Sequence, residues 1–260
     1  MTDPESLTIS EPDSSRFGMR VVRGILRKPN LRQIAQGIIA QGADVAILRC
    51  PAGEGSLMHG LARSALPVIH ADTLVYYEVD LEEWTPPPLR NRDMTMRLSE
   101  PGDVPALREL IAHTFTGYVS HYHANPLFGA AQILAGYQEW AEGYLSGEGR
   151  KLWVAERDGA LVAFASCSES ADGSVGEGVL YGVAPGAAGG GVYGDLIRHT
   201  QADFRARGFR RMRVSTQVPN FAVQKVWTRE GFHLVEAWDT LHVNALLSFG
   251  ETVHESKLVF

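Results

Sequence analysis

The sequence predicts an α/β (α+β) protein in which a small α/β domain precedes a larger domain, built on a mixed, mostly antiparallel sheet flanked by helices. Apolar residues recur with strand and helix periods in turn along most of the chain. The pattern stops at three consecutive prolines, residues 86–88, through which neither a helix nor a central strand continues. We therefore predict domains over residues 1–90 and 91–260, with the prolines in the linker.

The first domain is predicted to alternate strands with helices. Its first 16 residues are polar and lack the apolar centre of a signal peptide. We expect the extreme N-terminus to be disordered. The first helix follows Pro29 and Asn30, and asparagine is a favoured residue before a helix. The predicted strands cover residues 19–25, 44–49 and 74–79, and the predicted helices cover residues 31–41 and 56–64.

The second domain is predicted to begin with a strand and two helices, followed by three strands. Asp158-Gly159 and the polar residues 170–174 suit turns between these antiparallel strands. Gly208 suits the end of a long helix, and residues 244–260 receive no assignment. The predicted strands cover residues 94–98, 151–157, 160–168, 176–183, 211–217 and 232–242, and the helices cover 104–114, 126–145, a segment ending at Gly208, and 220–230.

Gly189, Gly190 and Gly191 stand between an apolar strand ending at Val183 and an amphipathic helix. Glycines at such a junction let backbone N–H groups approach an anion, and the helix N-terminus contributes about half a positive charge. The pattern therefore predicts a pyrophosphate cradle, although the glycines alone also fit a plain turn. A nucleoside triphosphate loop is excluded, because no Gly-Lys-Ser/Thr follows.

Composition excludes several other functions. The chain has 24 Lys and Arg against 30 Asp and Glu, a net charge of -6, which argues against nonspecific nucleic-acid binding. Cys50 and Cys167 give no disulfide framework, and no run approaches the ~18 apolar residues of a membrane span. We expect a cytoplasmic protein that binds a small-molecule substrate and neither nucleic acid nor a membrane. The sequence leaves open whether the protein forms a homodimer.

The order of the second domain's elements resembles the fold of the GCN5-related N-acetyltransferase (GNAT) family. Val183-x-Pro185 followed by Gly189-x-Gly191 is similar to the family's loop for the pyrophosphate of coenzyme A. Asn220, an aromatic residue seven positions on and Gly231-Phe232 resemble its later signature. The resemblance covers about residues 94–244. It implies acetyl coenzyme A as co-substrate, bound by Leu180, Tyr181, Val183, Gly189, Gly190, Gly191, Val192, Tyr193, Asn220 and Trp227.

Three residues depart from the family pattern. Ala188 stands where the loop usually has Gln or Arg, which removes a side-chain contact but leaves the backbone donors. Tyr193 is bulky where a small residue is usual. Trp227 stands where many relatives have a tyrosine that protonates the departing thiolate, and an indole N–H is no acid at neutral pH.

The resemblance also implies a general base. Glu177 lies on the strand before the glycine loop, where histone acetyltransferases of this fold carry their glutamate, although an exposed strand residue also fits. Period-two alternation puts Glu177, Val179, Tyr181 and Val183 on one face unless a bulge interrupts the strand. Tyr181 and Tyr193 are the nearest phenols to replace the missing acid, while each also suits packing, and proton return through water is the other route.

The loop over residues 117–126 lies between the two helices that flank the acceptor site in this fold. We predict that His121, Tyr122 and His123 contact the substrate, with loop packing as the alternative, and we expect no metal. The two-part layout and His-Tyr-His-x-Asn-Pro resemble the bacterial TDP-fucosamine acetyltransferases, which implies the amino group of a nucleotide-linked aminodeoxy sugar as acceptor. The alternatives are an amino acid, polyamine, antibiotic or protein amine, or a domain that binds coenzyme A without catalysis.

Overall fold

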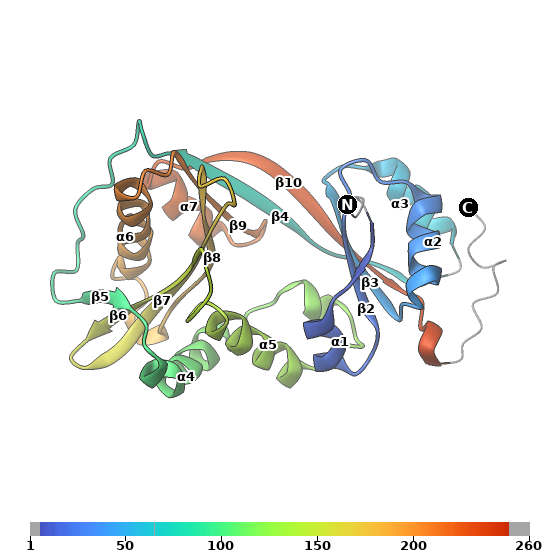
Figure 1. Ribbon diagram of the computed structural model, residues 1–260, viewed down its shortest axis with the longest axis horizontal. Coiled ribbons are helices and arrows are strands. Elements are labelled where there is room, and N and C mark those ends of the chain that lie inside the picture. Colours follow the sequence, from blue (N-terminus) through green and yellow to red (C-terminus); the bar gives the residue numbers. More distant parts are fainter. Residues whose placement is uncertain (1–5, 65, 250–260) are drawn as a thin grey trace. The chain divides into compact units, whose positions relative to one another are not determined.

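The computed structural model describes residues 6–64 and 66–249, which form two compact units (Figure 1). The first unit contains Met1–Leu74, Val119–Ile133 and Glu236–Phe260, and the second contains Val75–Tyr118 and Leu134–Val235. This division differs from the predicted boundary after residue 90. The prolines belong to the second unit, because the segment that follows them is hydrogen-bonded to a helix of that unit.

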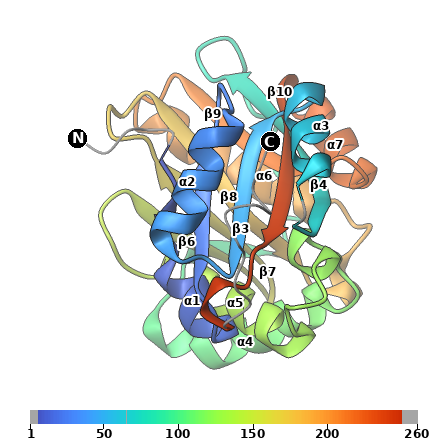
Figure 2. The ribbon, with the colours of Figure 1, turned by 90° about the vertical axis from the view of Figure 1, so that its right-hand side faces the viewer.

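The first unit consists of strands with helices on both faces. Its strand order is β1-β2-β3-β10-β4, with β2 and β3 parallel and β3 and β10 antiparallel. Helices α2 and α3 pack through buried leucine and isoleucine side chains onto one face, where Figure 2 shows α2 lying along the strands. The elements are β1 (Thr8–Ile9), α1 (Glu11–Phe17), β2 (Val21–Ile25), α2 (Leu31–Gln41), β3 (Val45–Pro51), α3 (Gly55–Arg63), the start of β4 (Val68–Asp80), the short helix η2 (His121–Ala124) and the end of β10 (His233–Asn244).

Helix α1 lies in the polar stretch at the start of the chain, where we predicted no helix. Its buried side chains are Asp13 and Phe17. Arg23 donates to the carboxylate of Asp13 at 2.6 Å, and the rings of Phe17 and Phe128 lie 4.1 Å apart. Partners so distant along the chain leave no periodic signal in a seven-residue helix. Residues 1–5 lie outside the described part of the chain.

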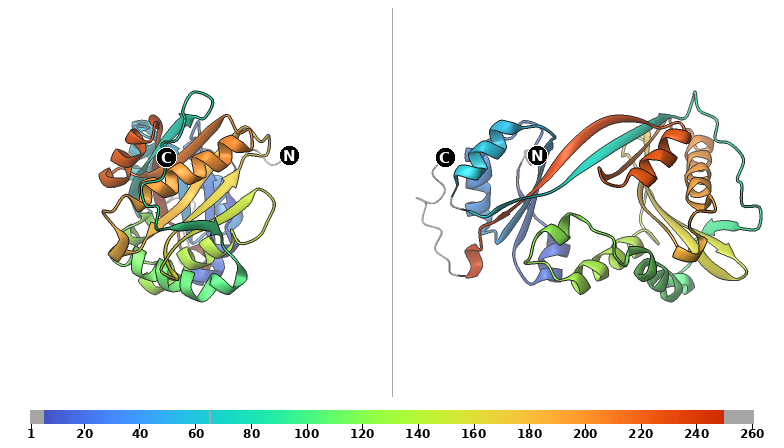
Figure 3. Two further views of the ribbon diagram at one scale, coloured as in Figure 1. Left: turned by 90° about the vertical axis from the view of Figure 1, so that its left-hand side faces the viewer. Right: turned by 180° about the vertical axis from the view of Figure 1, so that it is seen from behind.

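The second unit is a mixed sheet between two helical layers, as predicted. Its strand order is β4-β9-β8-β7-β6-β5, antiparallel from β5 to β8 and parallel between β8 and β9. Helices α4 and α5 cover one face, and α6 and α7 cover the other (Figure 3). The elements are β5 (Thr95–Leu98), α4 (Val104–Phe115), α5 (Ala130–Glu142), β6 (Arg150–Arg157), β7 (Ala160–Glu169), β8 (Val175–Val183), η3 (Pro185–Ala187), α6 (Val192–Ala206), β9 (Arg211–Gln217) and α7 (Phe221–Arg229).

All predicted helices and strands are present, with most ends displaced by a few residues. Helix α2 and strand β9 have the predicted bounds, whereas β4 begins six residues earlier than expected. Of the unassigned tail, η4 (Leu247–Phe249) is described, and residues 250–260 lie outside the description. Across the described residues, we find no helix with both the length and the apolar character that a bilayer crossing demands.

Candidate functional site

The parallel strands β8 and β9 separate part of the way along their length. Their ladder joins residues 175–178 to residues 211–214. Strand β8 continues to Val183 and β9 to Gln217, and no further pairing joins the two within this fully described region. A strand edge without a partner strand offers its N–H and C=O groups to a ligand or to water.

Two backbone donors of β8 point toward this opening. The N–H of Ala184 donates to the carbonyl of Val162 at 2.8 Å, on the side of β7. Backbone groups of successive strand residues point alternately to the two neighbouring strands. The N–H groups of Tyr181 and Val183 are therefore directed toward β9, beyond the end of the ladder.

A β-bulge in β8 changes which side chains share a face. The register with β7 shifts by one residue at Val179. Strict alternation would place Glu177 and Tyr181 on one face. The bulge is the interruption that the sequence left open, and its extra residue reverses the parity between them. Glu177 lies on the face covered by α4 and α5, whereas the hydroxyl of Tyr181 lies under α6.

Glu177 lies one residue before the end of the ladder, where it opposes Arg213. Its carboxylate accepts a hydrogen bond from the hydroxyl of Ser168 at 3.4 Å. Burial raises the pKa of Tyr144, and the negative charge of Glu177 raises it further. The structure therefore places a half-buried carboxylate beside the point where β8 and β9 separate.

The phenol of Tyr181 is enclosed rather than directed to the opening. Its hydroxyl donates to Thr200 Oγ1 at 2.9 Å and lies 3.4 Å from Cys167 Sγ. Burial, together with the neighbouring thiol, raises the pKa of Tyr181 well above its usual range. Of the two roles predicted for Tyr181, the backbone role fits this geometry, and the role of proton donor does not.

The three glycines form an open turn at the start of α6. Gly189 and Gly191 have φ of +82° and +85°, a left-handed conformation that side chains disfavour, and Gly191 is the residue before the helix. A Cβ added at Gly189 would meet no heavy atom within 4 Å, and one at Gly190 would meet only a carbonyl oxygen at 3.8 Å. Bare backbone with free space at a helix N-terminus is an arrangement that binds phosphate groups.

Tyr193 and Trp227, two of the departures from the family pattern, contact each other. The indole N–H of Trp227 donates to the hydroxyl of Tyr193 at 3.1 Å, within the apolar cluster under α6 and α7. Burial raises the pKa of Tyr193. The bulky residue in the loop and the indole that replaces the usual tyrosine thus form one packed pair, and neither is suited to donate a proton.

Polar side chains from three segments form hydrogen bonds with the ends of β8 and β9. The hydroxyl of Thr114, at the end of α4, donates to the carbonyl of Val183 at 3.4 Å. The hydroxyl of Tyr118 donates to Gln217 Oε1, and the amide of Asn220 donates to a hydroxyl at the end of β9. Sequence reasoning did not single out Thr114 or Gln217, because isolated polar residues at element ends form no pattern.

Two of the three residues predicted to contact the substrate, His121 and Tyr122, form hydrogen bonds within the first unit. His121 is buried, with Nδ1 3.0 Å from Nε2 of His242, and burial lowers the pKa of His121 well below its usual value. The hydroxyl of Tyr122 donates to Asp13 at 2.9 Å and accepts from Arg23. These contacts hold η2 against the strands, which is the packing alternative.

His123 differs from these two because its side chain is exposed. Its Nδ1 accepts a hydrogen bond from the backbone N–H of Ser120 at 3.1 Å, which caps the short helix η2. The rest of the ring faces solvent. Of the three predicted contacts, His123 alone keeps an exposed polar side chain.

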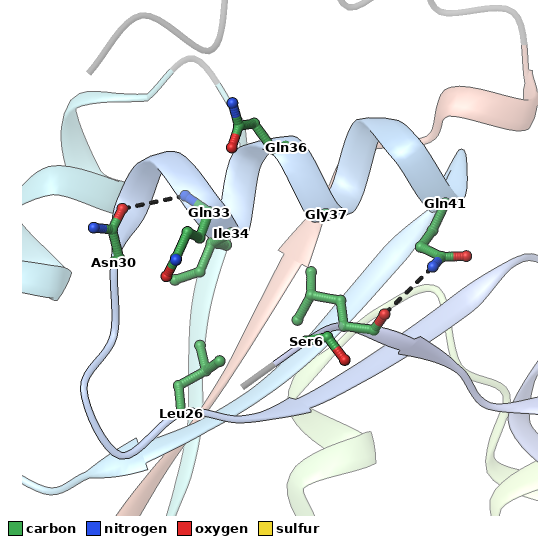
Figure 4. Close-up of a pocket in the computed structure, with 9 residues that line it drawn as sticks. Ser6, Leu26, Asn30, Gln33, Ile34, Gln36, Gly37 and Gln41 are labelled. Atoms are coloured by element: carbon green, nitrogen blue, oxygen red, sulfur yellow. Dashed lines mark hydrogen bonds between the residues drawn. The ribbon is translucent and has the colours of Figure 1, made fainter. Parts of the chain in front are cut away.

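The first unit also contains a pocket of about 240 Å³ beside α2 (Figure 4). Asn30 caps α2 by accepting from the backbone N–H groups of Arg32 and Gln33, and Gln41 donates to the carbonyl of Leu7. These amides therefore serve the fold. The lining residues are Ser6, Leu7, Leu26, Asn30, Gln33, Ile34, Gln36, Gly37 and Gln41.

Comparison with known families agrees with this geometry. Residues 105–232 match the model of the acetyltransferase (GNAT) family, and the match contains both β8 with its glycine loop and the helix that follows Asn220. This segment, 128 of the 260 residues, is similar in sequence to the GNAT family. GNAT proteins are generally N-acetyltransferases that use acetyl coenzyme A. None of the curated proteins compared with the chain matches it by sequence.

Solved structures resemble nearly the whole chain. A conserved protein of unknown function from Staphylococcus epidermidis has a TM-score of 0.63 at 13% identity, over 94% of this chain and 92% of that one. A GCN5-related N-acetyltransferase from Sphaerobacter thermophilus has a TM-score of 0.61 at 16% identity, over 91% and 75%. A glucosamine N-acetyltransferase region of a fungal β-N-acetylglucosaminidase has a TM-score of 0.59 at 14% identity, over 92% and 31%. At these identities the likeness is one of fold.

Proposed function

We propose that this protein is an N-acetyltransferase that transfers the acetyl group of acetyl coenzyme A directly to a small amine, without a covalent enzyme intermediate. The observation that carries the proposal is the early end of the β8–β9 ladder beside the glycine turn of α6. One opening thus combines backbone donors along a strand edge with an anion cradle at its end.

The residues present fit the co-substrate. The backbone N–H groups from Gly189 to Tyr193 would bind its pyrophosphate, and the open space at Gly189 and Gly190 leaves room for it. Acetyl coenzyme A supplies the acetyl thioester. The N–H groups of Tyr181 and Val183 are candidates to polarise the thioester carbonyl, because donors aimed at a developing oxyanion stabilise it.

Glu177 is the proposed general base. An amine that attacks a carbonyl must lose a proton, and a carboxylate beside the opening of the strands can accept it directly or through water. The enclosed phenols of Tyr181 and Tyr193 leave water as the proposed route by which the departing thiolate regains a proton.

The proposed acceptor is the amino group of a nucleotide-linked aminodeoxy sugar. The resemblance of residues 121–126 to the amino-sugar nucleotide acetyltransferases supports it, and the fungal glucosamine acetyltransferase region has the same fold. Such an amine titrates near neutrality, so a weak base suffices to keep it reactive.

Release of free thiol from acetyl coenzyme A, followed with a thiol-reactive dye, tests the proposal. A panel of amino-sugar nucleotides, amino acids, polyamines and peptides would serve as acceptors. Faster thiol release with amino-sugar nucleotides supports the proposed substrate class. Binding of coenzyme A without release for any acceptor would contradict the enzymatic proposal and favour a binding domain.

A further inference from the structure

A buried carboxylate fixes the segment after the prolines to the start of α6. Asp195, in the first turn of α6, is fully buried. It accepts from the backbone N–H groups of Arg90 and Asn91 at 2.9 and 2.8 Å, and from the side-chain amide of Asn91 at 2.8 Å. These three donors and the guanidinium of Arg198, 3.3 Å away, compensate its charge. Residues 90 and 91 are thereby held at the glycine loop.

The amide of Asn91 also holds the loop itself. Its Nδ2 donates to the carbonyl of Gly190 at 3.1 Å. In a trans peptide the C=O and the following N–H point in opposite directions, so this bond turns the N–H of Gly191 away from Asn91. Asn91 is therefore placed as a positioning residue that sets the direction of a donor in the cradle.

Arg90 places a free cation beside the same peptide. Its side chain is exposed, and a Cβ added at Gly191 would lie 3.5 Å from Cδ of Arg90. Over the described residues, its guanidinium has no hydrogen bond or ion pair with the protein. Ala188 stands where the family usually has Gln or Arg, and its methyl group cannot form a hydrogen bond with a phosphate.

Arg157 and Arg198, two other arginines of this region, are already paired. Arg157 lies 2.8 Å from the carboxylate of Asp93, and Arg198 lies 2.8 Å from that of Glu230. Arg198 is also buried, which removes it from any phosphate in solvent. Arg90 is therefore the cation of this set that is open to an anion at the loop.

We propose that Arg90 binds the pyrophosphate of acyl coenzyme A and so replaces the contact that Ala188 lacks, with Asn91 orienting the loop beneath it. The inference rests on the proposed use of coenzyme A by this site. It adds a cationic contact from a segment that precedes the family match, which begins at residue 105.

Calorimetric titration with coenzyme A tests this role in Arg90→Ala and in a matched control, Arg92→Ala, which removes the same charge from another exposed residue. We expect the Kd to rise about tenfold or more for Arg90→Ala, as for loss of a hydrogen bond to a charged group, and less than twofold for Arg92→Ala. Equal losses in both variants would mean a general charge effect and would overturn the proposal.

Two truncated ligands locate the contact. Dephospho-coenzyme A keeps the pyrophosphate, so the loss in Arg90→Ala should persist with it, and a loss confined to intact coenzyme A would overturn the pyrophosphate assignment. S-acetyl-pantetheine lacks the pyrophosphate, so its KM should be the same in Arg90→Ala and wild type. A change of more than threefold there would point to a structural effect and contradict the proposal.

The outcomes separate this inference from the proposed function. If the wild-type protein binds coenzyme A and Arg90→Ala binds it within twofold, the inference fails and the proposed function stands. If the wild-type protein does not bind coenzyme A, both fail. Asn91→Ala should weaken binding as well, while Asn91→Gln, which keeps the amide donor, should recover part of the loss.

Discussion

Replacement of Tyr193 by phenylalanine should reduce stability while leaving turnover nearly unchanged. The change removes the hydroxyl oxygen that accepts a hydrogen bond from the indole N–H of Trp227. Trp227 is only 3% exposed, so water cannot replace this acceptor. A buried donor left without a partner costs about 1–3 kcal/mol, so the free energy of unfolding should fall by about that amount. The ring itself remains, and the apolar packing against α7 is retained.

Urea unfolding followed by tryptophan fluorescence, together with kcat from thiol release, measures both effects. Trp227→Phe removes the donor, and the double variant should show a coupling energy of about 1 kcal/mol with Tyr193→Phe. If Tyr193 were instead the general acid, kcat would fall by about a hundredfold or more with an unchanged urea midpoint. That result would refute the view that Tyr193 and Trp227 form a structural pair.

Three further predictions follow from the same geometry. Glu177→Gln should lower kcat more than it raises KM, and a rate within twofold of wild type would remove Glu177 as the base. Gly190→Ala should leave the unfolding free energy nearly unchanged, whereas Gly191→Ala, at φ +85°, should lower it by about 1 kcal/mol; equal effects would contradict the loop geometry. Burial lowers the pKa of His242 to about 4, below its unfolded value of about 6.5, so folding favours the neutral form. The contribution of His242 to the free energy of unfolding should be full above about pH 6.5 and fall by up to about 3 kcal/mol toward pH 4, as measured by urea unfolding. His242→Phe should remove this contribution and leave that of the buried His121, whose pKa is also lowered.

The elements that sequence predicted well are those with local signals. Helix α2 begins after Asn30, whose side chain accepts two backbone N–H bonds, and its apolar period faces the strands. The glycines of residues 189–191 likewise mark the turn into α6, because positive φ is a property of the residue itself. Such signals depend on a few neighbouring residues and can be read directly.

The features that sequence did not predict depend on distant partners. The bulge at Val179 shows only in the register with β7, and it separates Glu177 from Tyr181. The sequence likewise does not indicate that the carboxylate of Asp195 accepts hydrogen bonds from the backbone N–H groups of residues 90 and 91, more than a hundred positions away. The pairing of Tyr193 with Trp227 joins two residues that, taken singly, were each a departure from the family pattern.

Calorimetric titration of the protein with acetyl coenzyme A shows whether the glycine loop binds the co-substrate. We expect saturable binding to the wild-type protein, retained in the exposed control variant Arg92→Ala and abolished in Gly191→Glu, where a carboxylate would oppose the pyrophosphate. Circular dichroism of the three proteins checks that each is folded. Absence of binding to the wild-type protein, or unchanged affinity in folded Gly191→Glu, would mean that residues 189–193 do not bind the pyrophosphate of coenzyme A.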